Sequence, residues 1–203
     1  MIRSLVIVAL LGGRVAAEPY AGTLGSADLV IRQDTDYRTG YLDHGGGGGL
    51  VAGIELGPVF AVELVARATA NGQHLAAARV TNLPVAGLAV TTATLGVRLR
   101  VPTTGPIVPF GRLGIGYAAI MPVFVDCPSC DTVFTAGLAV EAGLGVDLAA
   151  TAWLHVGAQA SSQLLHFESD AFERRLRQAG SEPSMTHATI TSVVCDVFAA
   201  VHF

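Results

Sequence analysis

The sequence has few charged and few aromatic residues. Only 14% of its 203 residues are Asp, Glu, Lys or Arg and only 6% are Phe, Trp or Tyr, whereas 51% are hydrophobic. A typical soluble domain has about 25% charged residues. An environment other than water is therefore needed to cover part of the apolar surface.

Long hydrophobic runs are also missing. No window contains the roughly 18 unbroken apolar residues that a membrane-spanning helix needs. An apolar chain with 24 glycines and little helical periodicity leaves two architectures. These are a soluble β-sandwich or barrel and a membrane β-barrel.

Clusters of basic residues are scarce, and the formal net charge is −4. The one exception is the group Arg174, Arg175 and Arg177. A nucleic-acid surface needs a basic patch or stripe, so we expect no nucleic-acid partner.

The first 17 residues have the pattern of a secretory signal peptide. Arg3 supplies the positive start, residues 5–11 form the apolar run, and Val15, Ala16 and Ala17 form a small-residue cleavage site. We therefore predict a signal peptide over residues 1–17 and one exported domain over residues 18–203. The alternative for this segment is a buried N-terminal strand or helix.

Two of the three cysteines, Cys127 and Cys130, lie close together. In an exported chain this spacing favours a disulfide that pins a loop. A metal site would need two further ligands, and only Asp126 and Asp131 are adjacent. A redox-active pair is disfavoured because no helix N-terminus follows to activate a thiol.

Apolar and polar residues alternate in eight segments, which we predict to be β-strands. The segments cover residues 26–33, 50–56, 59–69, 85–101, 107–120, 133–148, 153–165 and 185–203. The polar and then glycine-only stretch 34–49 predicts a flexible loop. Long connections (34–45, 70–84, 121–132, 166–184) alternate with short turns (57–58, 102–106, 149–152). This regular alternation is typical of an outer-membrane barrel, and a soluble sandwich has no reason to show it.

The two faces of these segments differ in charge. One face carries Leu, Val, Ile, Phe and Ala, and the other carries Gly, Ser, Thr and the strand-borne charges. We predict that these charges point into the barrel and pair there, because unpaired charges in a narrow interior are costly. They are Glu55, Glu63, Arg67, Arg98, Arg100, Arg112, Glu141, Asp147 and Asp196.

The last segment ends on Phe203, with Val201, Ala199 and Val197 at alternate positions before it. This pattern resembles the closing strand of bacterial outer-membrane β-barrels, and residues 108–118 resemble a central strand of the same family. The resemblance implies an eight-stranded, antiparallel, up-and-down transmembrane barrel in the cell outer membrane, similar to the barrel of outer-membrane protein A. It also implies that the barrel-assembly machinery reads Phe203 as an insertion signal.

The same resemblance implies contact with outer-membrane lipid and lipopolysaccharide, a monomeric state and no cofactor. Aromatic residues towards the strand ends are expected to form an interfacial belt. They are Phe110, Tyr117, Phe134, Trp153 and Phe203. A short amphipathic helix is plausible over residues 170–178 in the fourth long connection.

We predict a structural role or loop-mediated adhesion for this porin-like chain. One alternative is a barrel enzyme similar to the lipid A deacylases, but their His-x-Ser-Asn pattern is absent. The candidate residues for it are His155, Ser161, Ser162, His166, Glu168 and Ser169. A second alternative is a soluble periplasmic barrel that carries a small apolar ligand and has its charges outside. An open pore is disfavoured because paired charges would fill the lumen.

Overall fold

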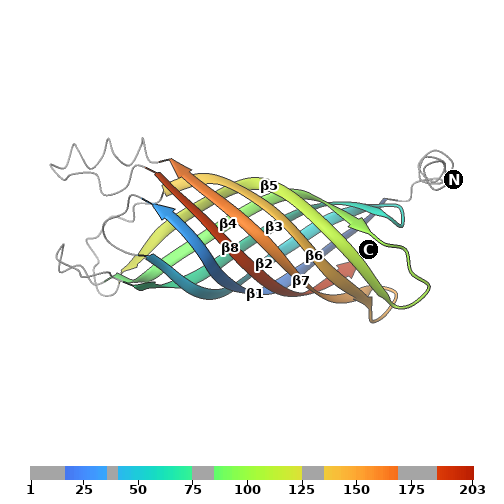
Figure 1. Cartoon of the computed structure of the whole chain (residues 1–203). Coiled ribbons are helices and arrows are strands. Elements are labelled where there is room, and N and C mark those ends of the chain that lie inside the picture. Colours follow the sequence, from blue (N-terminus) through green and yellow to red (C-terminus); the bar gives the residue numbers. More distant parts are fainter. Residues whose placement is uncertain (1–16, 36–40, 75–84, 125–134, 169–186) are drawn as a thin grey trace.

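The computed structural model describes residues 17–35, 41–74, 85–124, 135–168 and 187–203. These residues form eight antiparallel strands that close into a barrel in chain order (Figure 1). The strands are β1 (Ala17–Thr35), β2 (Tyr41–Leu56), β3 (Phe60–His74), β4 (Val85–Arg100), β5 (Ile107–Phe124), β6 (Thr135–Ala149), β7 (Leu154–Glu168) and β8 (His187–His202). None of the described residues belongs to a helix long and apolar enough to cross a membrane. The predicted all-β fold is confirmed.

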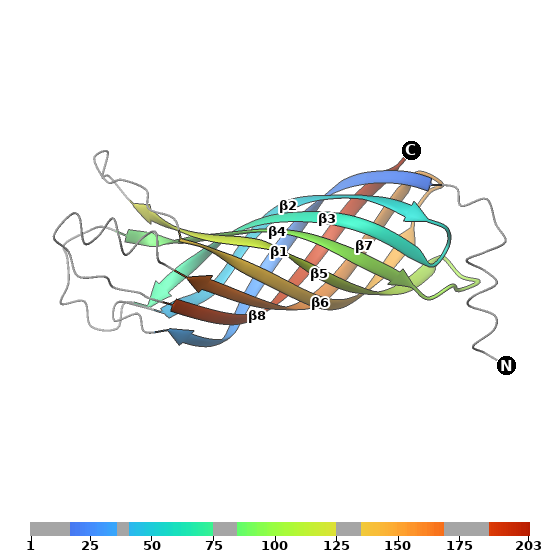
Figure 2. The ribbon, with the colours of Figure 1, turned by 90° about the horizontal axis from the view of Figure 1, so that it is seen from above.

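The barrel closes because β1 pairs with both β2 and β8. Tyr20 of β1 lies opposite Gly53 of β2 on one side and His202 of β8 on the other. The strands run obliquely to the long axis of the barrel in both views (Figures 1 and 2). Closure leaves no open sheet edge among the described strands, which is the condition for a β-structure to be stable in lipid.

The strands are connected differently at the two ends of the barrel. At the end where β1 begins and β8 finishes, residues 57–59, 101–106 and 150–153 make short turns (Figure 2). Gly57 has a φ of 83°, a left-handed conformation that glycine adopts without strain. We call this end the turn end and the opposite one the loop end. The connections at the loop end lie outside the described residues.

Several strands are longer than the sequence predicts. β1 begins at Ala17 rather than at residue 26, and β3, β5 and β7 continue to His74, Phe124 and Glu168. The extensions of β1, β3 and β7 contain glycine or polar residues and that of β5 contains a proline, and these residues weaken the local signal for a strand. Pairing with neighbouring strands holds the extensions in the sheet despite their composition.

The glycine run from Gly45 to Gly49 lies within β2, so the prediction of a flexible loop there was wrong. Gly45 pairs with Asp28 of β1 and with Asn71 of β3. Pairing on both sides offsets the entropy that glycine loses in a strand. A Cβ atom on Gly47 would lie 1.9 Å from the carbonyl oxygen of Ala68, so this close approach needs glycine.

The outer surface of the barrel is apolar. Leu95, Leu113, Leu144 and Val197 are 58%, 64%, 74% and 65% exposed. Such side chains stand outside because they alternate with inward ones along each strand. The arrangement is that of a barrel whose surrounding solvent is hydrocarbon, and it is opposite to what a soluble carrier with outward charges would show.

Phe110 departs from the predicted aromatic belt. It is only 2% exposed and points into the barrel, because it shares the inward face of β5 with Arg112. Tyr117, Trp153 and Phe203 are exposed as expected, and Phe134 lies outside the described residues.

Three other predictions also fall on residues that the structure does not describe. They are the Cys127–Cys130 disulfide, the short helix over residues 170–178, and the signal peptide apart from its last residue, Ala17. Ala17 is the first residue of β1.

Candidate functional site

The most unusual feature of the barrel is a set of charged side chains in its interior. Alternate positions of six strands, β2, β3, β4, β5, β6 and β8, carry them inward. Seven are at most 4% exposed, namely Glu63, Arg67, Arg98, Arg112, Glu141, Asp147 and Asp196. Glu55 and Arg100 lie nearer the turn end and are partly buried. These are the residues that the sequence places inside.

Arg67 is at the centre of the first group of ion pairs. Its two terminal nitrogens donate to Glu141, with Nη1–Oε2 and Nη2–Oε1 distances of 2.9 and 2.8 Å. Its Nε and Nη2 also donate to Asp196 Oδ2, at 3.1 and 2.7 Å. Fork-shaped pairing of this kind is the strongest contact that a guanidinium makes with carboxylates.

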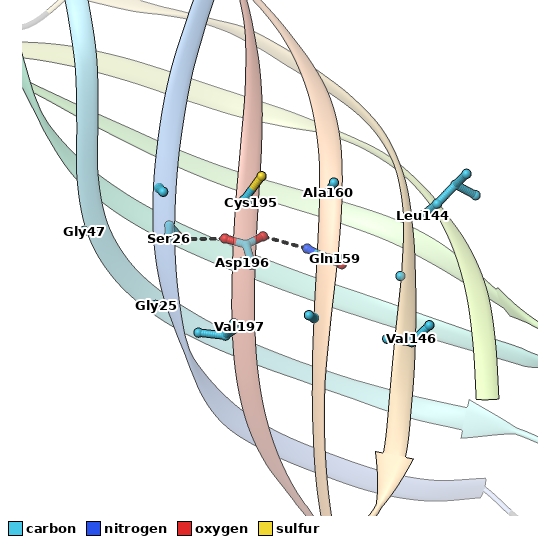
Figure 3. Close-up of a pocket in the computed structure, with 13 residues that line it drawn as sticks. Gly25, Ser26, Gly47, Leu144, Val146, Gln159, Ala160, Cys195, Asp196 and Val197 are labelled. Atoms are coloured by element: carbon cyan, nitrogen blue, oxygen red, sulfur yellow. Dashed lines mark hydrogen bonds between the residues drawn. The ribbon is translucent and has the colours of Figure 1, made fainter. Parts of the chain in front are cut away.

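Asp196 has further partners from both sides of its own strand. Ser26 Oγ donates to Asp196 Oδ1 at 2.5 Å, and Gln159 Nε2 donates to Oδ2 at 2.7 Å (Figure 3). Ser26 and Gln159 are its direct cross-strand neighbours in β1 and β7. A single carboxylate therefore joins three adjacent strands to Arg67 on a fourth strand.

Glu63 is the centre of the second group. Arg98 Nη2 lies 2.8 Å from Glu63 Oε1, Arg112 Nε lies 3.2 Å from Oε2, and the Tyr20 hydroxyl donates to Oε1. Arg112 also reaches Glu141 with an Nη1–Oε2 distance of 2.6 Å, so it links the two groups. Tyr20 occupies an inward position of β1, in the part of that strand that precedes the predicted segment 26–33.

Aromatic rings cover the guanidinium of Arg98. Its Cζ lies 4.0 Å from the centre of the Phe110 ring and 5.1 Å from that of Phe198. A desolvated cation–π contact is worth about 2 kcal/mol, which is a reason for an aromatic ring to point inward here. Phe110 thus packs against the charged network instead of lying at a membrane interface.

A third group lies near the turn end and includes two histidines. Arg100 Nη2 is 2.5 Å from Glu55 Oε1 and 3.0 Å from Asp147 Oδ2. His155 Nδ1 is 3.3 Å from Asp147, and His202 Nδ1 is 3.5 Å from Glu55. The inward parity of His202 is visible in the sequence, but its contact with Glu55 requires the closure of β8 onto β1.

Apolar side chains fill the interior towards the loop end. This cluster consists of Leu42, Val90, Ala118, Ala139, Leu165, Phe167, Ala188 and Ile190. Between it and the ion pairs, Asp28 is 5% exposed and accepts a 3.1 Å hydrogen bond from Asn71 Nδ2. Among the described residues, the charges are therefore concentrated in the middle and turn-end parts of the barrel.

No protein-family model matches the sequence, and no curated protein sequence is significantly similar to it. The solved structure of Neisserial surface protein A matches with a TM-score of 0.63 and 9% identity, over 93% of this chain and 99% of that one. The chain has the fold of the small eight-stranded outer-membrane β-barrels. The expected location in the outer membrane agrees with this fold.

Two other solved barrels show the same likeness. Outer membrane protein OprG from Pseudomonas aeruginosa has a TM-score of 0.54 and 14% identity, over 94% of this chain and 98% of that one. Outer membrane protein AlkL in lipid bilayers has a TM-score of 0.52 and 10% identity, over 95% of this chain and 92% of that one. At such low identities the likeness extends to the fold alone.

The candidate hydrolase residues do not come together in this barrel. His155 and His166 lie at opposite ends of β7. Ser161 is buried inside the barrel, whereas the next residue, Ser162, is exposed on the outer face. His166 Nδ1 lies 2.9 Å from Thr189 Oγ1 on β8. Ser169 lies outside the described residues, so the described members form no Ser–His pair.

Cys195 lies on the outer face of the barrel, which it shares with Val197 of the same strand. It is exposed and belongs to a shallow hollow that small residues of β1, β7 and β8 form (Figure 3). The small residues are Gly25, Ala27, Ala158 and Ala160, and Leu144, Val146 and Val197 flank them. In a membrane this hollow faces lipid.

Proposed function

We propose that this protein is an integral outer-membrane barrel with an interior closed by ion pairs, and that it acts as a rigid scaffold presenting its loop-end segments at the cell surface. The observation that carries the proposal is the charged network that crosses the lumen. Arg67 on β3 contacts carboxylates of β6 and β8, and Arg112 on β5 contacts carboxylates of β3 and β6.

The size of the barrel supports a closed interior. Eight strands enclose a space that side chains can just fill. Here long arginine and glutamate side chains extend across it, and they are almost completely buried. An open aqueous path would have to pass between side chains that are held 2.6–3.2 Å apart. We therefore propose a structural or loop-mediated interaction role rather than transport.

The partners that we propose follow from the outer surface. Its apolar side chains would contact outer-membrane lipid and lipopolysaccharide, with the barrel as a monomer. Phe203 is 76% exposed, and its backbone N–H donates to the carbonyl of Pro19 at 3.0 Å. An exposed terminal aromatic at the turn end would be accessible to the barrel-assembly machinery.

Planar-bilayer recording tests the closed interior. Protein extracted from outer membranes is first checked for heat-modifiable gel mobility, which reports a folded barrel, and is then incorporated into the bilayer. We expect no stable conductance steps. Co-sedimentation of the same sample with vesicles controls for incorporation. Reproducible steps from folded protein would contradict the closed interior.

Loop replacement tests the scaffold role. The segments 36–40, 75–84, 125–134 and 171–184 are each replaced by a short Gly-Ser connection. We expect at least one replacement to reduce attachment of expressing cells to a protein-coated surface while heat-modifiable mobility is kept. The matched control is replacement of residues 103–105 in the β4–β5 turn. Unchanged attachment for all four replacements would contradict a loop-mediated role.

A further inference from the structure

A group of potential metal ligands lies at the turn-end opening of the barrel. Glu18, Glu55 and His202 each point one ligand atom into the same space, and these atoms lie within 4.8 Å of one another. They come from β1, β2 and β8, which are adjacent around the closed barrel. We propose that these three side chains bind a divalent transition-metal ion of the zinc class.

The carboxylates are placed where a cation is needed. Glu18 and Glu55 are direct cross-strand partners, and like charges in such a pair repel each other. Glu55 pairs with Arg100, but Arg100 also contacts Asp147. Glu18 forms no ion pair with any of the described residues. The two facing carboxylates therefore have one arginine between them, and that arginine also pairs with Asp147. A divalent ion would neutralise the remaining negative charge.

The imidazole of His202 is held ready to coordinate. Its ring stacks on Tyr20 at a centroid distance of 5.0 Å and lies 3.9 Å from the ring of His155. Its Nδ1 is 3.5 Å from Glu55 Oε1. Two ligands of a tetrahedral zinc ion are about 3.4 Å apart, given metal–ligand distances of about 2.1 Å. This pair is therefore already at the separation that the ion requires.

Glu55 Oε1 is the atom that the neighbouring groups share. It lies 2.5 Å from Arg100 Nη2 and 3.5 Å from His202 Nδ1, and the Glu55 side chain is 12% exposed. A metal ion at this oxygen would take the place of the Arg100 contact. Arg100 can stay paired with Asp147 when Glu55 coordinates the ion, so metal binding would not leave the arginine without a carboxylate partner.

The ligand set selects the kind of ion. One imidazole nitrogen and two carboxylate oxygens suit zinc and its neighbours in the transition series, whereas magnesium and calcium take oxygen ligands alone. Glu18 is exposed at the opening, so an ion can enter from the turn end. A water molecule would complete the coordination, as in zinc sites with three protein ligands.

Titration calorimetry with zinc tests the site. The protein carries no polyhistidine tag, is extracted from outer membranes in detergent and is freed of metal with a chelator. We expect one zinc ion per chain and no heat from magnesium. Glu18→Gln should weaken zinc binding at least about tenfold. Loss of a residue that merely hydrogen-bonds a metal ligand already lowers metal affinity by about that factor, and loss of a ligand should lower it at least as much. His202→Phe should do the same, since it keeps the stacking but removes the ligand.

Matched controls lie at the loop end. Asp34→Asn and His44→Phe change an exposed carboxylate and an exposed histidine and should leave zinc affinity unchanged. His202 precedes the terminal Phe203, so its replacement could affect assembly, and heat-modifiable mobility is checked for each variant. If His202→Phe does not assemble, the zinc affinity of Glu18→Gln alone tests the proposal. Absence of zinc binding, or binding that Glu18→Gln does not weaken, would overturn the proposal. Either result leaves the closed interior untouched, since conductance measures that separately.

Discussion

At the scale of single residues, Arg67 makes five hydrogen bonds to two buried carboxylates. It holds Glu141 and Asp196 at distances of 2.8 and 2.7 Å from its Nη2. Burial of an ion pair contributes little net stability, because desolvation offsets the attraction. Removal of Arg67 is different, since Asp196 then stays buried without a cationic partner and Glu141 keeps only Arg112.

Replacement of Arg67 by alanine is therefore expected to be severe. Arg67→Ala leaves two carboxylates facing each other and should lower the free energy of unfolding by about 3–5 kcal/mol. Urea unfolding in lipid vesicles, followed by tryptophan fluorescence, measures the change. The control is Arg32→Ala, which removes an exposed arginine of β1.

A triple variant separates charge from packing. Arg67→Met combined with Glu141→Gln and Asp196→Asn removes the three charges and keeps most of the volume. We expect it to regain most of the stability that Arg67→Ala loses, because no uncompensated charge remains. A triple variant as unstable as Arg67→Ala would show that the site needs the arginine for packing.

At the scale of elements, β2 contains a stretch that local preference does not favour as a strand. Its glycines pair with β1 and β3, and the sheet around them decides their conformation. Successive glycines nevertheless differ in their surroundings. The strand itself therefore offers a matched pair of positions.

Gly47 and Gly46 should respond in opposite ways to alanine. A Cβ on Gly47 would clash with the Ala68 carbonyl oxygen, so Gly47→Ala should cost roughly 1–3 kcal/mol through backbone shifts. The nearest atom to a Cβ on Gly46 is 3.7 Å away, at ordinary contact distance. Gly46→Ala should be neutral or stabilise the barrel by up to about 1 kcal/mol. Urea midpoints in vesicles measure both, and equal effects would contradict the close approach at Gly47.

At the scale of the whole molecule, the closed barrel sorts side chains by environment. Charges gather inside, apolar side chains stand outside, and the turns lie at one end. The orientation of the last strand places Cys195 among the outward residues. Its accessibility therefore reports whether lipid surrounds the barrel.

Thiol labelling in vesicles tests this arrangement. In a Cys127→Ser/Cys130→Ser background, we expect a charged maleimide not to label Cys195 until the protein is unfolded, because lipid excludes the reagent. Thr103→Cys, in the exposed β4–β5 turn and with Cys195→Ala added, should be labelled in the folded protein. Rapid labelling of Cys195 in folded, vesicle-bound protein would contradict a lipid-facing position.

Part of the site could be predicted from local pattern, and part could not. The inward positions of Glu63, Arg98 and Arg112 follow from a period of two along their own strands. The inward Phe110 has the same parity, but an aromatic residue near a turn was assigned to the membrane interface. The glycines of β2 carry no side-chain pattern, so only their neighbours show that they form a strand.

By itself, the sequence determined the number of strands, the short turns at one end, and the inward face of the nine charges from Glu55 to Asp196. These properties depend on local periodicity and turn chemistry. The predicted long connection 34–45 was wrong, since only residues 36–40 separate β1 from β2. Only the tertiary structure decided the partners. Arg67 meets Glu141 and Asp196 across 74 and 129 positions of sequence. Such contacts depend on the closure and stagger of the barrel, which bring distant strands to opposite sides of one narrow interior.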